Sequence, residues 1–387
     1  MVSISAALSD PPAPLTRRCV LATLTTLVTV GGTGCGDGKP SGPPTPVARA
    51  APQLPILPTM ERPASPSTAA PPAEARSPLT WLPVENAALV QRRIVAVKVD
   101  NAPLARPQFG LSLAEVVYEH LAEGGVTRFL AMYLVNQPER VGPVRSARLV
   151  DLYLGQEWDF LLAYAGAGTT TAQLLSEAMI PLFKAPELGE RLDGTPFFRD
   201  SSRPIPHNMF VRVAEVREEA ARNAGTPPTV EIHPFPFQAP PADAGPLRSI
   251  SVPYVVPGAL NWQYLVTWRF DPASGTWKRT MGGAPHVDAL TGQQVEAEDV
   301  LLQFAEIVVA THVEPDAAGN PASDTVLHGE GRAVLFHSGQ IFEGKWSKEH
   351  DRAKTEYRLL DGAPMPFRPG RVWVHILPTD FQATWSA

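Results

Sequence analysis

Proline is concentrated in one early segment, and this limits where the chain can fold. Of 42 prolines in 387 residues, 12 fall between positions 36 and 80, among many alanines, serines and threonines. Such a segment buries too little apolar surface to offset the entropy lost on ordering, and its prolines favour extended conformations. We therefore expect residues 36–80 to be a disordered, Pro/Ala-rich linker, and the folded part of the chain to begin near residue 81.

The residues before this linker predict export from the cytoplasm. Arg17 and Arg18 directly precede an apolar stretch over residues 19–30, which is too short to cross a membrane and is typical of a signal peptide. The stretch is followed by Gly-Gly-Thr-Gly-Cys, which resembles a lipoprotein cleavage box with Cys35 as the lipidated residue. We expect residues 1–35 to be a lipoprotein signal peptide, and lipidated Cys35 to anchor the protein on the outer side of the cytoplasmic membrane. Ordinary signal cleavage and an uncleaved anchor are the alternatives.

Composition and motifs exclude several functional classes. Both cysteines lie in the first 35 residues, which leaves no disulfide, thiolate metal site or thiol nucleophile in the folded part. The 33 Lys and Arg residues against 39 Asp and Glu give a formal charge of −6, which argues against nucleic acid as a partner. The sequence has no common zinc-peptidase, serine-hydrolase or penicillin-binding motif, and its nine histidines lack metal-ligand spacing. We expect no metal and no cofactor.

Apolar patterns predict an α/β layered domain over residues 81–235, because strands and helices alternate there. Period-two or continuous apolar runs indicate the strands, and apolar residues at one-face spacing indicate the helices. Ser112 followed by Glu115 also predicts a capping box at the start of a short helix. The expected strands are 94–99, 116–122, 126–134 and 160–166, and the expected helices are 146–156, 169–178 and 211–224.

After a Pro-rich join over residues 227–246, the pattern changes to strands alone. In the run from 261 to 270, apolar and aromatic residues alternate with polar ones, so Val266, Trp268 and Phe270 fall on one face of a strand. This placement favours a core position for Trp268 over stacking on a sugar. We expect a mostly antiparallel, all-β domain over residues 247–387, and the α+β fold class for the whole folded part.

The stretch from Gly142 to Arg148 is the most informative for function. A Gly-Pro turn is expected to lead into a helix whose first turn has free N–H groups, with Arg145 and Arg148 three residues apart on one side. Two guanidinium groups at that position would suit a carboxylate or phosphate. The alternative is internal pairing, in which Arg148 bridges Asp151 and Arg145 meets Asp100 or Glu119.

Other polar residues could line the same cleft, at the ends of the expected strands. His207 lies near arginines and acids, so it could act as a general base, or it could have a turn or capping role. The candidate ligand-binding residues are Asp100, Asn101, Arg106, Glu119, Arg128, Arg145, Ser146, Arg148, Arg203, His207 and Asn208.

Five stretches of this sequence resemble the YerB-like family of bacterial lipoproteins. They are KVDNAPLARPQFGLSLAEVVYEHLAEGGVTRF, GPVRSAR, FRDSSRPIPHNM, GGAPHVDALTGQQVEAEDVLLQF and PGRVWVHILP, and the likeness covers about residues 90–380. The resemblance implies a lipidated N-terminus followed by two consecutive domains of unknown function. The family has a His-containing strand end where this chain has Tyr164-Ala165-Gly166-Ala167-Gly168.

Three functional hypotheses follow. The first is an exported, membrane-tethered envelope lipoprotein that binds an anionic ligand, such as a cell-wall precursor, a glycan or a peptide carboxylate. The second is an envelope enzyme that acts on phosphodiester or glycan linkages, with His207 as acid or base. The third is a scaffold that docks another envelope protein. The sequence favours a binding protein over an enzyme.

Overall fold

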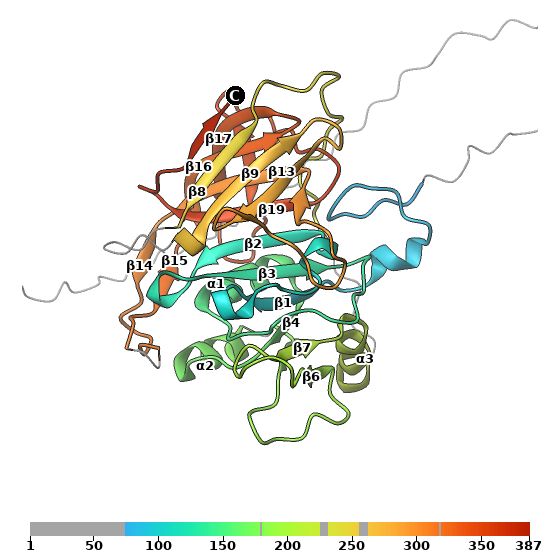
Figure 1. The fold of residues 1–387 in the computed structure, drawn as a ribbon, viewed down its shortest axis with the longest axis vertical. Helices are drawn as coiled ribbons and strands as arrows, with labels where there is room; N and C mark the ends of the chain where they lie inside the picture. The colour runs from blue at the N-terminus through green and yellow to red at the C-terminus, as the bar shows by residue number, and fades with distance from the viewer. Residues whose placement is uncertain (1–73, 179, 225–230, 255–261, 317–318) are drawn as a thin grey trace, which may run out of the picture. The chain divides into compact units, whose positions relative to one another are not determined.

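One ten-stranded sheet runs through both halves of the folded chain (Figure 1). The computed structural model describes residues 74–178, 180–224, 231–254, 262–316 and 319–387. In sheet order the strands are β18 (Glu356–Leu359), β17 (Gln340–Lys348), β16 (Gly329–His337), β13 (Asp299–Ala305), β19 (Val372–Pro378), β2 (Val116–Leu121), β3 (Thr127–Tyr133), β1 (Val95–Asp100), β4 (Leu161–Tyr164) and β5 (Leu182–Lys184).

The two halves meet where β2 pairs with β19. This pair is parallel, with Val116 opposite Val372 and His120 opposite Ile376. The sheet therefore continues across the Pro-rich join, and the described residues belong to one structural unit. The division into domains at 81–235 and 247–387 stays a prediction.

A second sheet packs against one face of the C-terminal half. It contains β11 (Ala284–Pro285), β10 (Thr276–Met281), β9 (Leu265–Asp271), β8 (Ser249–Pro253) and β20 (Thr384–Ser386), with β12 (Glu296–Ala297) paired to β10. Trp268 and Trp277 from this sheet and Trp373 from β19 are buried together in the core. Two smaller pairs are β14 (Ile307–Val309) with β15 (Ser323–Thr325), and β6 (Phe197–Arg199) with β7 (Met209–Val211).

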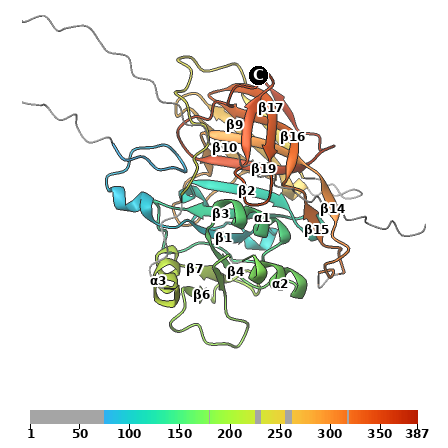
Figure 2. The same cartoon turned by 180° about the vertical axis from the view of Figure 1, so that it is seen from behind.

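Helices cover the N-terminal half of the large sheet on both faces (Figures 1 and 2). Helices α1 (Leu149–Trp158) and α2 (Thr169–Glu177) share a core with Ala96 of β1. Helix α3 (Val213–Ala224) and the β6–β7 pair share the opposite core with Val97. Successive residues of β1 thus point to opposite layers, and all of its residues are buried. Short 3₁₀ turns lie at Ala87–Gln91, Pro103–Ala105, Leu111–Leu113, Glu123–Gly125 and Trp262–Tyr264.

The α+β fold class expected from the sequence is confirmed. The hairpin around Glu-Gly-Gly is confirmed by the antiparallel pairing of β2 with β3, and Trp268 is a core residue as expected. The capping box at Ser112 and Glu115 is wrong, because only a 3₁₀ turn forms there. Ser112 donates its hydroxyl to Asp288, and Glu115 accepts backbone N–H groups from residues 134–136.

The expected helix at 146–156 begins later, at Leu149. Residues 145–147 lie outside the helix instead, because their backbone groups bond to the ends of neighbouring strands. The N–H of Arg145 donates to the carbonyl of Lys98 at 2.9 Å, and the N–H of Ala147 donates to the carbonyl of Gly166 at 3.0 Å. The free N–H groups of the first helical turn therefore begin after Arg148, the N-cap residue, and not at Ser146 as expected.

The expected signal peptide at 1–35, its lipidated Cys35 and most of the linker at 36–80 lie outside the described residues. Within the described residues, each helix is too short or too polar to span a membrane.

Candidate functional site

The candidate site lies at the carboxyl ends of the parallel strands β1 and β4. These strands pair through Val97 and Ala163, and then the extended segment from Val144 to Ala147 runs between them. Arg145 bridges the two strand ends, because its N–H donates to Lys98 and its carbonyl accepts the N–H of Ala165 at 2.9 Å. Such a parting of strands is the usual place for a ligand in an open α/β sheet.

A pocket of about 270 Å³ opens at this place. Its charged lining residues are Arg145, Lys184, Glu187 and Arg199, and its wall also includes Gly166 and Pro206. Three elements supply the charges: the segment between β1 and β4, the end of β5 with the residues after it, and the end of β6. The pocket therefore combines residues that are far apart in the sequence.

Arg145 is held on one side and open on the other. Its Nε lies 2.9 Å from Oδ2 of Asp100, and its side chain is 26% exposed. The terminal nitrogens Nη1 and Nη2 form no hydrogen bond with any described residue. Because Arg145 lines the pocket, these terminal nitrogens are available to an anion there. The pairing of Arg145 with Asp100 was one of the sequence alternatives, but it uses only one edge of the guanidinium group.

Asp100 also holds His207. The Nδ1 of His207 lies 2.7 Å from Oδ2 of Asp100, while Oδ1 of Asp100 accepts the N–H of Ala102 at 3.0 Å. His207 is nearly buried, and its Nε2 has no hydrogen-bond partner among the described residues. A carboxylate thus holds an imidazole and a guanidinium together, which is an arrangement suited to acid/base chemistry or anion binding, although only Arg145 of the three lines the pocket.

The other lining cations differ in how far they are neutralised. Lys184 donates to Oε1 of Glu187 at 2.8 Å, and this hydrogen bond raises the pKa of Lys184. Arg199 donates to the neutral Oδ1 of Asn208 at 3.0 Å and has no carboxylate within 4 Å among the described residues. Asn208 therefore positions Arg199, which keeps its positive charge for the pocket.

Arg128 and Arg148 are used inside the protein. Arg128 donates to the carbonyl of Ser146 at 2.8 Å, and burial lowers the pKa of Arg128 to about 10. Arg148 pairs with Glu123 and donates to the carbonyl of Ala147 at 2.9 Å. The alternative of internal pairing thus holds for Arg148, but its side chain pairs with Glu123 and not with Asp151.

Asp151 instead accepts the backbone N–H of Arg148 at 2.7 Å and the buried Nζ of Lys98 at 2.6 Å. Burial lowers the pKa of Lys98 to about 8. The sequence reasoning did not identify this buried pair.

Arg106 and Arg203 donate to backbone carbonyls and fix loops, while Asn101 Nδ2 donates to Thr127 Oγ1 at 2.6 Å. Arg106 donates to the side chain and the carbonyl of Asn101, at 3.1 and 2.8 Å, and to the carbonyl of Gln263 at 2.7 Å. Arg203 donates to the carbonyls of Pro107 and Ala105, at 2.9 and 2.7 Å. These contacts give both arginines a structural role.

Glu119 is a buried structural residue at the meeting of the two halves. Its carboxylate accepts two bonds from Arg279, at 3.0 and 2.9 Å, and one from Trp373 Nε1 at 3.1 Å. Both partners of the ion pair are fully buried. Sequence reasoning missed Arg279, since 160 positions separate it from Glu119.

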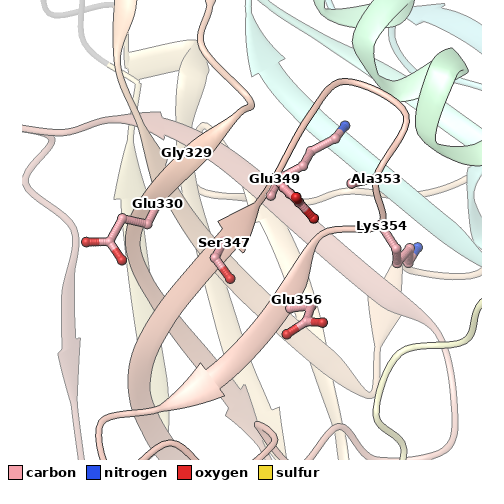
Figure 3. Close-up of a pocket in the computed structure, with 8 residues that line it drawn as sticks. Gly329, Glu330, Ser347, Glu349, Ala353, Lys354 and Glu356 are labelled. Carbon is pink, nitrogen blue, oxygen red and sulfur yellow. The ribbon is translucent and has the colours of Figure 1, made fainter. Parts of the chain in front are cut away.

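A larger, open pocket of about 610 Å³ lies on the C-terminal half (Figure 3). Its lining includes Glu330, Glu349, Glu356 and Lys354. Figure 3 shows Glu330 and Lys354 on opposite sides, so the charged groups do not converge on one point. No group of three metal-ligating side chains is found among the described residues. The pocket beside Arg145 is therefore the better candidate site.

Comparison with known proteins identifies the family. Residues 79–226 match the N-terminal domain, and residues 258–374 the C-terminal domain, of the family described as "Protein of unknown function (DUF3048)". The chain is 33% identical over 324 residues to the protein named "Putative lipoprotein YerB" of Bacillus subtilis (strain 168), and the match covers 84% of this chain and 91% of that protein. This chain belongs to the DUF3048 family.

A solved structure agrees with this assignment. The crystal structure of the YerB protein from Bacillus subtilis matches with a TM-score of 0.69 and 30% identity, over 81% of this chain and 100% of that chain. The resemblance to the YerB-like family is thereby confirmed. The DUF3048 models cover both halves of the continuous sheet, and the matched residues include Arg145 and Arg279.

This DUF3048 protein has glycine at the strand end that follows β4. Gly166 lines the pocket and has a φ of +80°, which favours glycine. Lys184 and Arg199 also line the pocket but were not among the predicted site residues. Arg199 is one of the arginines that lie near His207 in the sequence, so its position gave a signal, whereas Lys184 belongs to no motif.

Proposed function

We propose that this protein is exported, lipidated at Cys35, and binds an anionic ligand in the pocket beside Arg145. The proposed address rests on the sequence around Cys35 and on the likeness to a Bacillus subtilis protein named as a putative lipoprotein. A cell-wall precursor, a glycan acid or a peptide carboxylate, all available outside the cytoplasmic membrane, would carry the required charge. Its partner in this proposal is the membrane itself, through the lipid on Cys35, and one of these wall components.

The observation that carries the binding proposal is the unpaired edge of Arg145. Its two terminal nitrogens form no hydrogen bond with any described residue, although Asp100 lies 2.9 Å from its Nε as an ion-pair partner. The two terminal N–H groups of a guanidinium match an anion with two oxygens side by side. Arg199 adds a second positive charge without a carboxylate partner. An anion in the pocket would satisfy both.

Binding is tested by calorimetric titration of muropeptides into the full-length protein in detergent. We expect Arg145→Ala to weaken binding at least about tenfold, because a charged hydrogen bond contributes about 1.5–3 kcal/mol. Arg145→Lys keeps the charge but loses the paired donors, so its affinity should lie between that of wild type and that of Arg145→Ala. Arg332→Ala, at an arginine that is 51% exposed in the C-terminal half, is the matched control. Equal binding by wild type and Arg145→Ala would contradict the proposal.

The proposed anchor is tested separately from the pocket. Cys35→Ser removes the thiol to which the lipid would be attached. We expect wild type to fractionate with membranes and to carry the mass of the lipid, and the variant to lose both properties. Membrane association and a lipid mass that persist in Cys35→Ser would rule out this residue as the anchor.

The pairing of His207 with Asp100 favours a second candidate, an envelope enzyme. Asp100 fixes the imidazole through Nδ1 at 2.7 Å and leaves Nε2 without a described partner, as in a general acid or base. Phosphodiester or glycan hydrolysis would then place developing negative charge near Arg145. Turnover of bis(p-nitrophenyl) phosphate or a chromogenic wall glycoside by wild type, lost in His207→Gln, would support this candidate. No turnover of either substrate by wild type would remove it.

A further inference from the structure

The charges that line the pocket beside Arg145 match one negative charge on a ligand. Lys184 and Glu187 pair at 2.8 Å and offset each other. Arg145 is partly offset by Asp100, which also holds His207. Arg199 has no carboxylate partner among the described residues. A monoanion is therefore balanced by this lining, whereas a dianion such as a phosphate monoester would keep an uncompensated negative charge.

The donor geometry points to a carboxylate in particular. Asp100 forms an ion pair with Arg145 on the Nε side without a hydrogen bond from Nε, and the two terminal nitrogens form no hydrogen bond with any described residue. These nitrogens present two parallel N–H donors, which match the two oxygens of a carboxylate. Only four of the residues that line the pocket are charged: Arg145, Lys184, Glu187 and Arg199.

The rest of the pocket is apolar. Its remaining wall is made largely by Val144, Ala165, Ala185, Leu188, Ile205 and Met209. Leu188 is 68% exposed and Ile205 is 57% exposed, so two large aliphatic side chains of the pocket wall are exposed to solvent. Contact with an apolar ligand group would remove their surface from water and stabilise the complex. A sugar would need polar partners along this wall, which the aliphatic side chains do not offer.

The volume restricts the size of the bound part. At about 270 Å³ the pocket is smaller than the range of roughly 300–1,000 Å³ that holds a drug-sized ligand. It therefore fits the end of a molecule, such as one or two small amino-acid residues or a short acyl chain. The rest of a larger ligand would lie outside the pocket.

We propose that the pocket recognises a carboxylate that carries a small apolar group next to it, and that it selects against phosphates and sugar acids. This inference rests on the proposed function, since it names the ligand class of the same site. Two sources share this chemistry: the C-terminus of a peptide that ends in small apolar residues, and a short-chain fatty acid.

The test compares four probes by calorimetry on the full-length protein in detergent. N-acetyl-alanyl-alanine and hexanoate have the proposed chemistry, while glucuronate is a sugar acid and inorganic phosphate is a small anion without an apolar group. We expect the first two to bind at least about tenfold more tightly than the last two. Tighter binding of the dipeptide than of hexanoate identifies a peptide C-terminus, and the reverse order identifies an acyl chain. The C-terminal amide of the dipeptide should not bind.

Two substitutions test the apolar wall. Ile205→Ser and Leu188→Ser alter exposed side chains, so the fold should tolerate both, and each should weaken binding of the tighter probe about tenfold. Leu360→Ser, at a leucine that is 74% exposed in the C-terminal half, is the matched control and should change nothing. If glucuronate or phosphate binds as tightly as the apolar carboxylates, or if both wall variants bind like wild type, the selection is overturned while anion binding stands. If none of the four probes binds to wild type, both the inference and the proposed function fail.

Discussion

The buried ion pair between Glu119 and Arg279 should be a main determinant of stability, because it joins the two halves of the chain. Arg279 lies on β10 of the second sheet, is fully buried, and donates to both oxygens of Glu119 on β2. Its guanidinium carbon also lies 5.0 Å from the centroid of the Trp373 ring and 5.4 Å from that of Phe129. We expect Arg279→Met to destabilise the whole folded unit.

The magnitude follows from what the substitution leaves behind. Without Arg279, Glu119 retains bonds from Trp373 Nε1 and Thr127 Oγ1. His375 Nδ1 also lies 3.4 Å from Glu119, but burial lowers the pKa of His375, which keeps this imidazole neutral. Breaking one side of a buried ion pair costs about 3–5 kcal/mol, because the remaining charge is neither solvated nor paired. Against a total stability of about 5–15 kcal/mol, this is a large fraction. Glu119→Met combined with Arg279→Met removes both charges and should recover most of the loss.

Urea unfolding of the full-length protein in detergent, followed by tryptophan fluorescence and far-UV circular dichroism, measures these free energies of unfolding. Arg332→Met is the matched control: it removes an arginine that is 51% exposed and pairs with Glu343 at 3.7 Å, so it should change the free energy by less than about 0.5 kcal/mol. A loss below about 1 kcal/mol in Arg279→Met, or a double variant no more stable than the single one, would refute the reasoning.

Three further substitutions test other contacts by urea unfolding. Asp288→Asn weakens the acceptor of two backbone N–H groups in the loop at 110–112, held at 2.9 and 2.7 Å, and should cost about 1.5–3 kcal/mol; an unchanged midpoint would contradict this. Gly344→Ala would place a Cβ against the carbonyl oxygen of Arg358, so it should cost about 1–3 kcal/mol of stability. The same steric clash should speed amide hydrogen exchange in β18, and unchanged exchange there would contradict it. Burial of Nζ lowers the pKa of Lys354 from 10.5 to about 7. Between pH 7 and pH 10.5 the unfolded state therefore binds more protons than the folded state, so the contribution of Lys354 to the free energy of unfolding rises with pH. Any advantage of Lys354→Met over wild type should therefore shrink from pH 7 to pH 9.5, and a constant difference would exclude this titration.

Local patterns predicted the elements that depend on local contacts. The hairpin of β2 and β3 is encoded by two apolar runs and a Gly-Gly turn, and β9 by the alternation that buries Val266 and Trp268. The pairing of β2 with β19 depends on residues about 250 positions apart, which no local pattern reveals. Ser112 and Glu115 show the same limit, because their spacing fits a capping box while their side chains bind groups far along the chain.

The candidate site was predictable only in part, for the same reason. Asp100, Arg145 and His207 were selected from separate stretches of sequence, and the structure brings these three together. Their grouping depends on strands and loops that converge at one edge of the sheet, so their arrangement could not be derived from spacing. Glu119 was also selected, but its partner Arg279 lies on a different sheet, and this turns a candidate ligand residue into a structural one.

The different fates of Arg145 and Arg148 follow from the backbone between them. In a helix, residues three apart share a side, which is why both arginines were expected to face one ligand. The helix begins only at Leu149, however, so both arginines lie in a non-helical segment where the helical rule for residues three apart does not apply. Arg145 accordingly lines the pocket, while Arg148 turns inward to Glu123 and to the carbonyl of Ala147. The inward arginine thus fixes the segment that presents the outward one, and a single open guanidinium is what this backbone allows.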